Sequence, residues 1–153
     1  QVCATAAGGK VNPGKSGAHI GIASDVIINK DGYQHFIYKD KKHKFTTPAF
    51  NFDEVTELPN NAILLSSDKV NNVMGIYFNV RNSEIMGLQY HPDYEYQQMI
   101  NLIVGRKERL FKNKNFLNEE EYQNHISYIK SENELLNFSD RSCEVRNWLN
   151  HIK

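Results

Sequence analysis

The sequence has little that would indicate a disulfide scaffold, a membrane span or a charge-driven partner. Its two cysteines, Cys3 and Cys143, lie far apart and do not make a disulfide framework, so a reducing compartment, the cytoplasm, is expected. Lysine plus arginine and aspartate plus glutamate each number 18, so no net field attracts nucleic acid or an acidic membrane. No apolar run approaches the ~20 residues that a membrane-spanning helix needs. Neither nucleic acid nor a membrane is therefore an expected partner.

The composition that remains is that of one globular domain. Hydrophobic residues make up 40% of the 153 residues, which is too many for a disordered chain and enough for one core. Residues 1–7 are alanine-rich and helix-compatible, and Gly8 and Gly9 supply a helix stop. Because no helix start signal precedes Gln1, the segment is typical of the tail of a longer helix. We therefore expect a cleaved chain or a fragment of a longer protein.

Residues 20–90 and the residues beyond Tyr94 differ in hydrophobic pattern. In the first range, short β-branched and aromatic runs alternate with turn residues, which predicts strands. Beyond Tyr94 apolar residues recur at helical spacing, and Asn118 and Asp140 are placed to cap helices. We expect strands at 20–22, 26–28, 62–65, 73–78 and 85–90, and helical stripes within 99–110 and 122–129. The last expected stripe consists of Val145, Trp148, Leu149 and Ile152.

The apolar run 85–90 ends abruptly in His91-Pro92-Asp93. Side chains at i and i+2 of an extended backbone point the same way, and Pro92 disfavours the helical region for His91. His91 and Asp93 can therefore face one side, as the base and the orienting carboxylate of a nucleophilic triad. The alternative is a strand end that carries an incidental surface histidine.

Residues 9–16, Gly-Lys-Val-Asn-Pro-Gly-Lys-Ser, match the phosphate-loop pattern. That motif works between a buried strand and the N-terminus of a helix. Here a helix-like segment comes before it, and glycines and β-branched residues follow. We therefore expect an exposed, lysine-bearing loop rather than a nucleotide site. The basic run at 39–44 is expected to be a solvated turn.

The sequence predicts no cofactor and no metal site. Cys3 lies in the alanine-rich helical segment, where a small buried thiol is commoner than a reactive one, so it is not the expected nucleophile. The histidines outside residues 39–44 and 91–93 lack the spacing of metal ligands; they are His19, His35, His125 and His151.

Four segments, in order, resemble class I (triad-type) glutamine amidotransferases, particularly the GMP synthase glutaminase type. Residues 1–11 resemble the last residue of the nucleophile-elbow motif G-x-C-x-G-x-Q and the helix after it. Residues 51–59 resemble H-x-D-x-V-x-x-L-P, residues 62–67 resemble A-x-x-L-A-x-S, and residues 87–93 resemble G-x-Q-[FY]-H-P-E. The resemblance covers residues 1–103. It implies part of a flavodoxin-like α/β fold in residues 1–110, followed by a helical C-terminal extension at 111–153.

The resemblance also implies a reaction, in which a Cys-His-acid triad hydrolyses the side-chain amide of glutamine and ammonia passes to a synthase domain or subunit. His91 would be the general base and acid, and Asp93 its orienting group. Gln1, Phe50 and Asn51 would bind the glutamine. The family's cysteine falls four residues before Gln1, so residues 1–153 alone are expected to be inactive. Asp93 replaces the usual glutamate, and Asn51 stands where many relatives have histidine.

Two alternatives stay open at this point. One is a γ-glutamyl hydrolase-type peptidase on the same fold, with water as the acceptor. The other is a non-catalytic binding member of the family. Residues 53–59 favour the amidotransferase branch over the peptidase.

Overall fold

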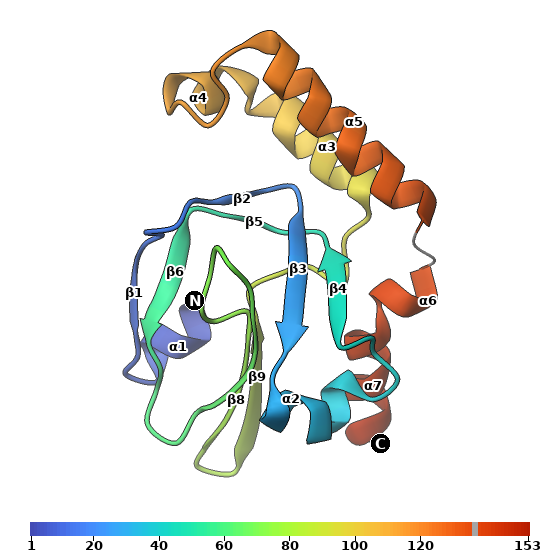
Figure 1. Cartoon of the computed structure of the whole chain (residues 1–153). Coiled ribbons are helices and arrows are strands. Elements are labelled where there is room, and N and C mark those ends of the chain that lie inside the picture. Colours follow the sequence, from blue (N-terminus) through green and yellow to red (C-terminus); the bar gives the residue numbers. More distant parts are fainter. Residues whose placement is uncertain (136–137) are drawn as a thin grey trace.

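Figure 1 shows a mixed α/β structure in which an antiparallel sheet lies below a pair of long helices. The computed structural model describes residues 1–135 and 138–153. Its main sheet has the strand order β4-β3-β7-β8-β9, and each described pair of neighbours is antiparallel. These strands are β3 (Ala23–Ile28), β4 (Lys44–Thr47), β7 (Ile63–Ser67), β8 (Gly75–Val80) and β9 (Ser83–Leu88).

Two short ladders accompany the main sheet. β1 (Lys10–Pro13) pairs with β6 (Asp53–Glu57), and β2 (His19–Ile20) pairs with β5 (Phe50–Asn51). The strand expected at 20–22 is interrupted, because Gly21 has φ +86°, a conformation that favours glycine. The other expected strands are confirmed, with shifted ends.

The segment that matches the phosphate-loop pattern joins two strands. β1 covers residues 10–13, and β2 follows the loop where a nucleotide site would need a helix. The backbone N–H of Lys15 donates to Oε1 of Glu54 at 3.2 Å, so this loop faces a carboxylate. The expectation of a loop without a phosphate-binding helix is confirmed.

The helices lie at the N-terminus, after β3 and after β9. α1 (Val2–Ala6) is the expected alanine-rich helix and ends before Gly8, which has φ +90°. Asn29 caps α2 (Lys30–Gln34) by accepting from the N–H of Gly32, and the 3-10 helix η1 (Phe36–Tyr38) follows. After β9 come α3 (Tyr96–Gly105), α4 (Lys107–Lys112), α5 (Glu119–Leu135), α6 (Phe138–Arg141) and α7 (Cys143–His151). Among the residues described, no helix is long and apolar enough to cross a membrane.

Helices α3 and α5 lie side by side (Figure 1) and bury the apolar stripes that the sequence predicts. Met99 and Ile103 of α3 are buried, as are Ile126 and Ile129 of α5. Asn118 begins α5 as expected, since its Oδ1 accepts from the N–H of Glu121 at 2.8 Å. A cluster of buried side chains joins these helices to the β2–β3 connection; its members include Ile20, Ile22, Tyr96, Ile103, Phe116, Tyr122 and Ile129.

Helix α7 buries a different face from the one that the sequence predicts. Leu149 and Ile152 of the expected apolar stripe are 51% and 59% exposed, whereas Glu144 is 1% exposed. On this buried face Glu144 forms an ion pair with Lys41, Nζ to Oε2 at 2.9 Å. Residues 39, 40 and 42–44 are exposed, as the expected solvated turn requires, whereas the Lys41 side chain is only 5% exposed. Ser142, not Asp140, stands at the N-cap of α7.

Candidate functional site

His91 lies just beyond the end of the edge strand β9. Its backbone N–H donates to the carbonyl of Pro48 at 2.7 Å, which fixes the chain where it leaves the sheet. Its Nδ1 lies 3.5 Å from Oδ1 of Asp93, and the two side chains are 39% and 60% exposed. The two side chains thus lie close together, and their catalytic roles stay a prediction.

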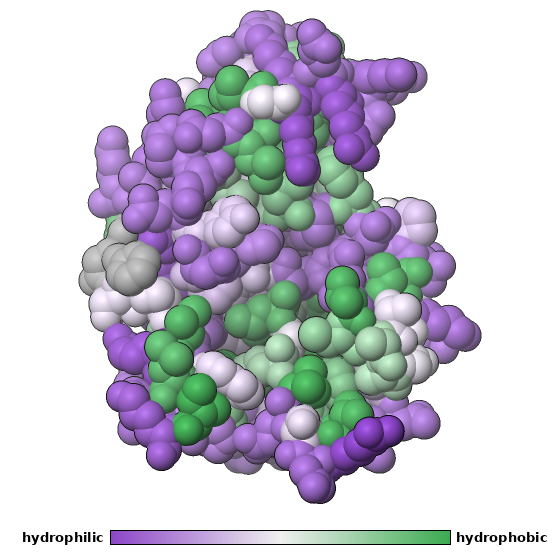
Figure 2. Space-filling view, turned by 180° about the vertical axis from the view of Figure 1, so that it is seen from behind, coloured by the Kyte–Doolittle hydropathy of each residue, from purple (hydrophilic) through white to green (hydrophobic). Residues whose placement is uncertain are grey.

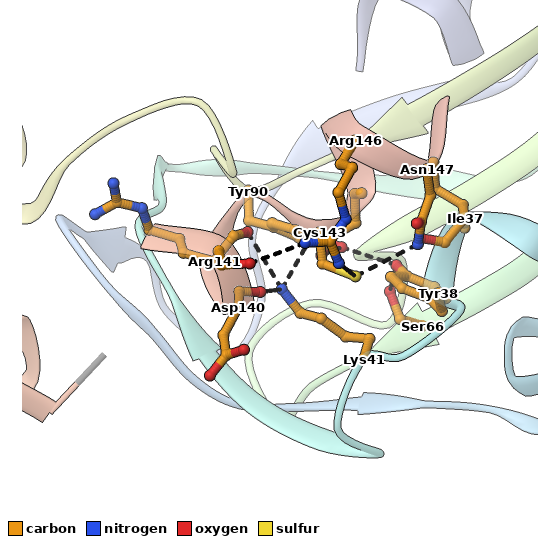
Figure 3. A network of polar contacts seen from close by, with 12 residues as sticks. Ile37, Tyr38, Lys41, Ser66, Tyr90, Asp140, Arg141, Cys143, Arg146 and Asn147 are labelled. Carbon is orange, nitrogen blue, oxygen red and sulfur yellow. Dashed lines mark hydrogen bonds and ion pairs between the residues drawn. The ribbon is translucent and has the colours of Figure 1, made fainter. Parts of the chain in front are cut away.

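A buried polar network holds the residue that precedes His91. The Tyr90 hydroxyl donates to Oε1 of Glu144 at 2.7 Å and lies 3.0 Å from the Tyr38 hydroxyl (Figure 3). The Tyr38 hydroxyl in turn lies 2.8 Å from Oγ of Ser66. Burial raises the pKa of Tyr90 well above its usual value of 10.0, so its hydroxyl stays a donor. Helix α7 is thereby anchored to the strand end that carries His91.

A pocket of about 350 Å³ brings together four of the five residues predicted for the site. Gln1 lies at the start of α1, Phe50 and Asn51 form β5, and His91 follows β9. The remaining lining residues include Val2, Cys3, Met86, Gly87, Leu88 and Gln89. Among these described lining residues there is no lysine or arginine, so neutral donors and His91 face a bound molecule.

The fifth predicted residue, Asp93, lines a neighbouring hollow of about 530 Å³. This hollow lies between the end of β9 and α7, and it also borders His91 and Trp148. Figure 2 shows that apolar side chains gather on the reverse face of the molecule, in the half that contains the sheet. His91 therefore lies between a mixed polar pocket and a mainly apolar hollow.

Three side-chain amides converge on one backbone carbonyl at the pocket. The carbonyl of Asp53 accepts from Nε2 of Gln1 at 2.7 Å, from Nδ2 of Asn51 at 3.0 Å and from Nε2 of Gln89 at 3.1 Å. Gln89 was not predicted for the site. The sequence feature that could have indicated Gln89 is its position two residues before His91, because side chains at i and i+2 of an extended backbone point the same way.

A buried histidine–aspartate pair contacts Asn51, one of the residues that line the pocket. Nε2 of His19 lies 2.8 Å from Oδ2 of Asp68, and these side chains are 3% and 0% exposed. Nδ1 of His19 lies 2.9 Å from Oδ1 of Asn51. Sequence spacing offered no signal for the pair, because Asp68 and Asn51 are 49 and 32 residues away from His19. Within the part of the chain that the structure describes, no group of three or more His, Cys, Asp or Glu could hold a metal ion.

Cys3 is exposed and borders the pocket, so the expectation of a buried thiol there is wrong. The cause is the orientation of α1, which buries Ala4 and turns Cys3 outward. Cys143, in α7, is the buried cysteine.

Residues 1–107 match the family model described as "Glutamine amidotransferase class-I". A curated relative from a Pseudomonas species, "Gamma-glutamyl-L-1-hydroxyisopropylamide hydrolase", is 26% identical over 99% of this chain and 58% of its own length. The chain thus spans less than two thirds of that relative.

Two solved structures share the fold. A glutamine amidotransferase from Thermotoga maritima superposes with a TM-score of 0.65 at 21% identity, over 94% of this chain and 56% of its own. A protein described as one of the subunits of a GMP synthase, from Thermoplasma acidophilum, gives a TM-score of 0.52 at 21% identity, over 73% and 56% of the two chains. The expected fold class is confirmed by these similarities.

Proposed function

The chain belongs to the class I glutamine amidotransferase family, and from this we propose that it supplies the histidine side and the glutamyl pocket of a Cys-His-acid site. The observation that carries the proposal is the single pocket lined by Gln1, Phe50, Asn51 and His91. These residues come from three separate segments of the chain, and the predicted base lies beside the predicted substrate-binding groups.

The proposed reaction is the one that the family resemblance implies for His91 and Asp93 together with a cysteine nucleophile. A cysteine thiolate attacks the γ-carbonyl carbon of a glutamyl amide and forms a tetrahedral intermediate. His91, which takes the thiol proton, returns it to the leaving nitrogen, and the C–N bond breaks to give a glutamyl thioester. Water then attacks the thioester with His91 again as the base, the C–S bond breaks to release glutamate, and His91 returns the proton to the cysteine sulfur. Asp93 orients the imidazole and stabilises its charged form.

We propose that the nucleophile is a cysteine four residues before Gln1 and not Cys3. In the family's elbow motif the cysteine precedes the glutamine that Gln1 matches, whereas Cys3 lies two residues after it. The relatives are longer than this chain, which covers 56–58% of their lengths. Residues 1–153 alone are then inactive, and activity needs the residues that precede Gln1. The free thiols of Cys3 and Cys143 support a reducing compartment such as the cytoplasm.

The acceptor separates two versions of this function. An amidotransferase passes the released ammonia to a synthase domain or subunit, whereas a γ-glutamyl hydrolase releases the amine into water. The segment at 53–59, which resembles the amidotransferase motif, favours the first version. The curated relative that hydrolyses a γ-glutamyl amide favours the second.

The test uses the full-length polypeptide that contains this chain, assayed with glutamine and with γ-glutamyl alkylamides. Ammonia release from glutamine supports the amidotransferase version, and a strong preference for the alkylamides supports the hydrolase. A serine or glycine four residues before Gln1, together with no turnover of either substrate, contradicts both and leaves the non-catalytic binding member. Residues 1–153 produced alone serve as the negative control.

A further inference from the structure

The buried pair formed by His19 and Asp68 has no part in the reaction described above, yet it touches the pocket wall. His19 lies directly opposite Asn51 in the β2–β5 ladder. Its two ring nitrogens contact Oδ1 of Asn51 at 2.9 Å and Oδ2 of Asp68 at 2.8 Å. Oδ1 of Asp68 accepts from the backbone N–H groups of Val70 and Asn71 at 2.9 and 2.7 Å, which fixes the carboxylate.

The hydrogen bonds determine which atoms carry protons. The carbonyl of Asp53 can only accept, so the amide nitrogen of Asn51 must face it and Oδ1 must face His19. Nδ1 of His19 therefore donates. The carboxylate of Asp68 also accepts, so Nε2 of His19 donates as well. Both ring nitrogens of His19 are thus placed as donors, one to Asn51 and one to Asp68.

This arrangement determines which hydrogen-bonding group Asn51 can offer to the pocket. The amide nitrogen of Asn51 donates to the carbonyl of Asp53, and Asn51 itself lines the pocket. A ring N–H that donates to the amide oxygen polarises the amide, which makes its N–H groups stronger donors. The described pocket lining has no lysine or arginine, so such a donor is the feature best suited to an anionic oxygen.

We propose that His19 and Asp68 are positioning residues that orient and polarise the Asn51 amide, which then donates to the α-carboxylate of the glutamyl substrate. This inference rests on the proposed function, because it takes the pocket to be the glutamyl site. It adds two buried residues that act through Asn51 and do not touch the substrate.

The test compares His19→Gln, Asp68→Asn, Asn51→Ala and Asn51→Asp in the full-length polypeptide. Asn51→Asp is the sharpest variant, because it keeps an acceptor for His19 while it removes the N–H donor. Each variant is expected to raise KM for glutamine by about 10- to 100-fold, the range for a hydrogen bond to a charged group, with a smaller change in kcat. In an Asn51→Ala background, His19→Gln is expected to raise KM no further.

The control is Asn29→Ala, which removes the side chain that caps α2 and does not line the pocket. It should lower the melting temperature and leave KM unchanged.

The ¹⁵N resonances of His19 give a readout that does not depend on turnover, and both ring nitrogens should be protonated. Three results would overturn the positioning role in an active wild type. KM could be unchanged in Asn51→Asp, or the effects of His19→Gln and Asn51→Ala could be additive. The third is a single ring proton on His19. A wild type that turns over no γ-glutamyl substrate overturns the proposed function and this role with it.

Discussion

Nδ1 of His91 lies 3.5 Å from Oδ1 of Asp93, and Asp93 is the more exposed of the two, at 60%. Pro92 lies between the two residues in the sequence, and the backbone N–H of His91 is held by the carbonyl of Pro48 at 2.7 Å. A long contact to an exposed carboxylate orients a histidine only weakly. The roles of the two residues are therefore expected to separate in kinetic measurements.

Replacing His91 by asparagine should lower kcat for glutamine hydrolysis by about 10⁴-fold or more, since the thiol loses its base and the leaving amine its acid. Binding of glutamine, followed by calorimetry, should change little. A kcat within tenfold of the wild type would show that another group supplies the proton.

Replacing Asp93 by asparagine is expected to cost only about 10-fold in kcat, because solvent already screens an exposed carboxylate. Asp93→Glu restores the side-chain length of the resembled family motif and should match or exceed the wild type. A 10³-fold loss in Asp93→Asn would indicate a tighter contact during turnover.

Breaking the buried ion pair by Lys41→Met should lower the free energy of unfolding by about 3–5 kcal/mol, because the Glu144 charge is left buried without a partner. Lys41→Met combined with Glu144→Gln should recover much of this loss, since the amide oxygen still accepts from Tyr90. Urea unfolding measures both variants. Lys10 is the matched control: its 2.8 Å pair with Glu57 is 64% and 58% exposed, and Lys10→Met should cost less than about 1 kcal/mol.

Stability should fall as the pH rises above 10. Burial raises the pKa of Tyr90 above 10.0, so the unfolded chain loses this proton first while the folded chain keeps it. The stabilisation is complete below pH 10 and is lost above it, by up to about 1.4 kcal/mol per pH unit for this group. Unfolding free energies at pH 9–11.5 should decline less steeply in Tyr90→Phe, whereas Tyr33→Phe, at a side chain 67% exposed, should keep the wild-type slope.

Two helical glycines should respond in opposite directions to alanine. A Cβ at Gly32 in α2 would collide with the backbone carbonyl oxygen of Leu65, which cannot move aside, so Gly32→Ala should cost about 3 kcal/mol or more. A Cβ at Gly105, at the end of α3, meets nothing within 4 Å, so Gly105→Ala should stabilise by up to about 1 kcal/mol. Thermal unfolding of both variants checks the packing of α2 on β7, and equal effects would contradict it.

Features that depend on neighbouring residues could be predicted from the amino-acid order alone. The strand before His91-Pro92-Asp93, the helix stop at Gly8 and the cap at Asn118 follow from spacing within one or two turns, as do the stripes of α3 and α5. Such local patterns set backbone geometry directly. Together with the ordered motifs, they were sufficient to predict the family and the fold class.

Which distant polar groups meet depends on the folded chain. Lys41 and Glu144 are 103 residues apart, and His19 and Asp68 are 49 apart, yet each pair is buried at about 2.9 or 2.8 Å. The sequence does not distinguish a charged residue that is exposed to solvent from one that is paired in the core, because the partner is brought close only when the chain folds. For this reason the buried face of α7 and the support behind Asn51 could not be predicted from local spacing.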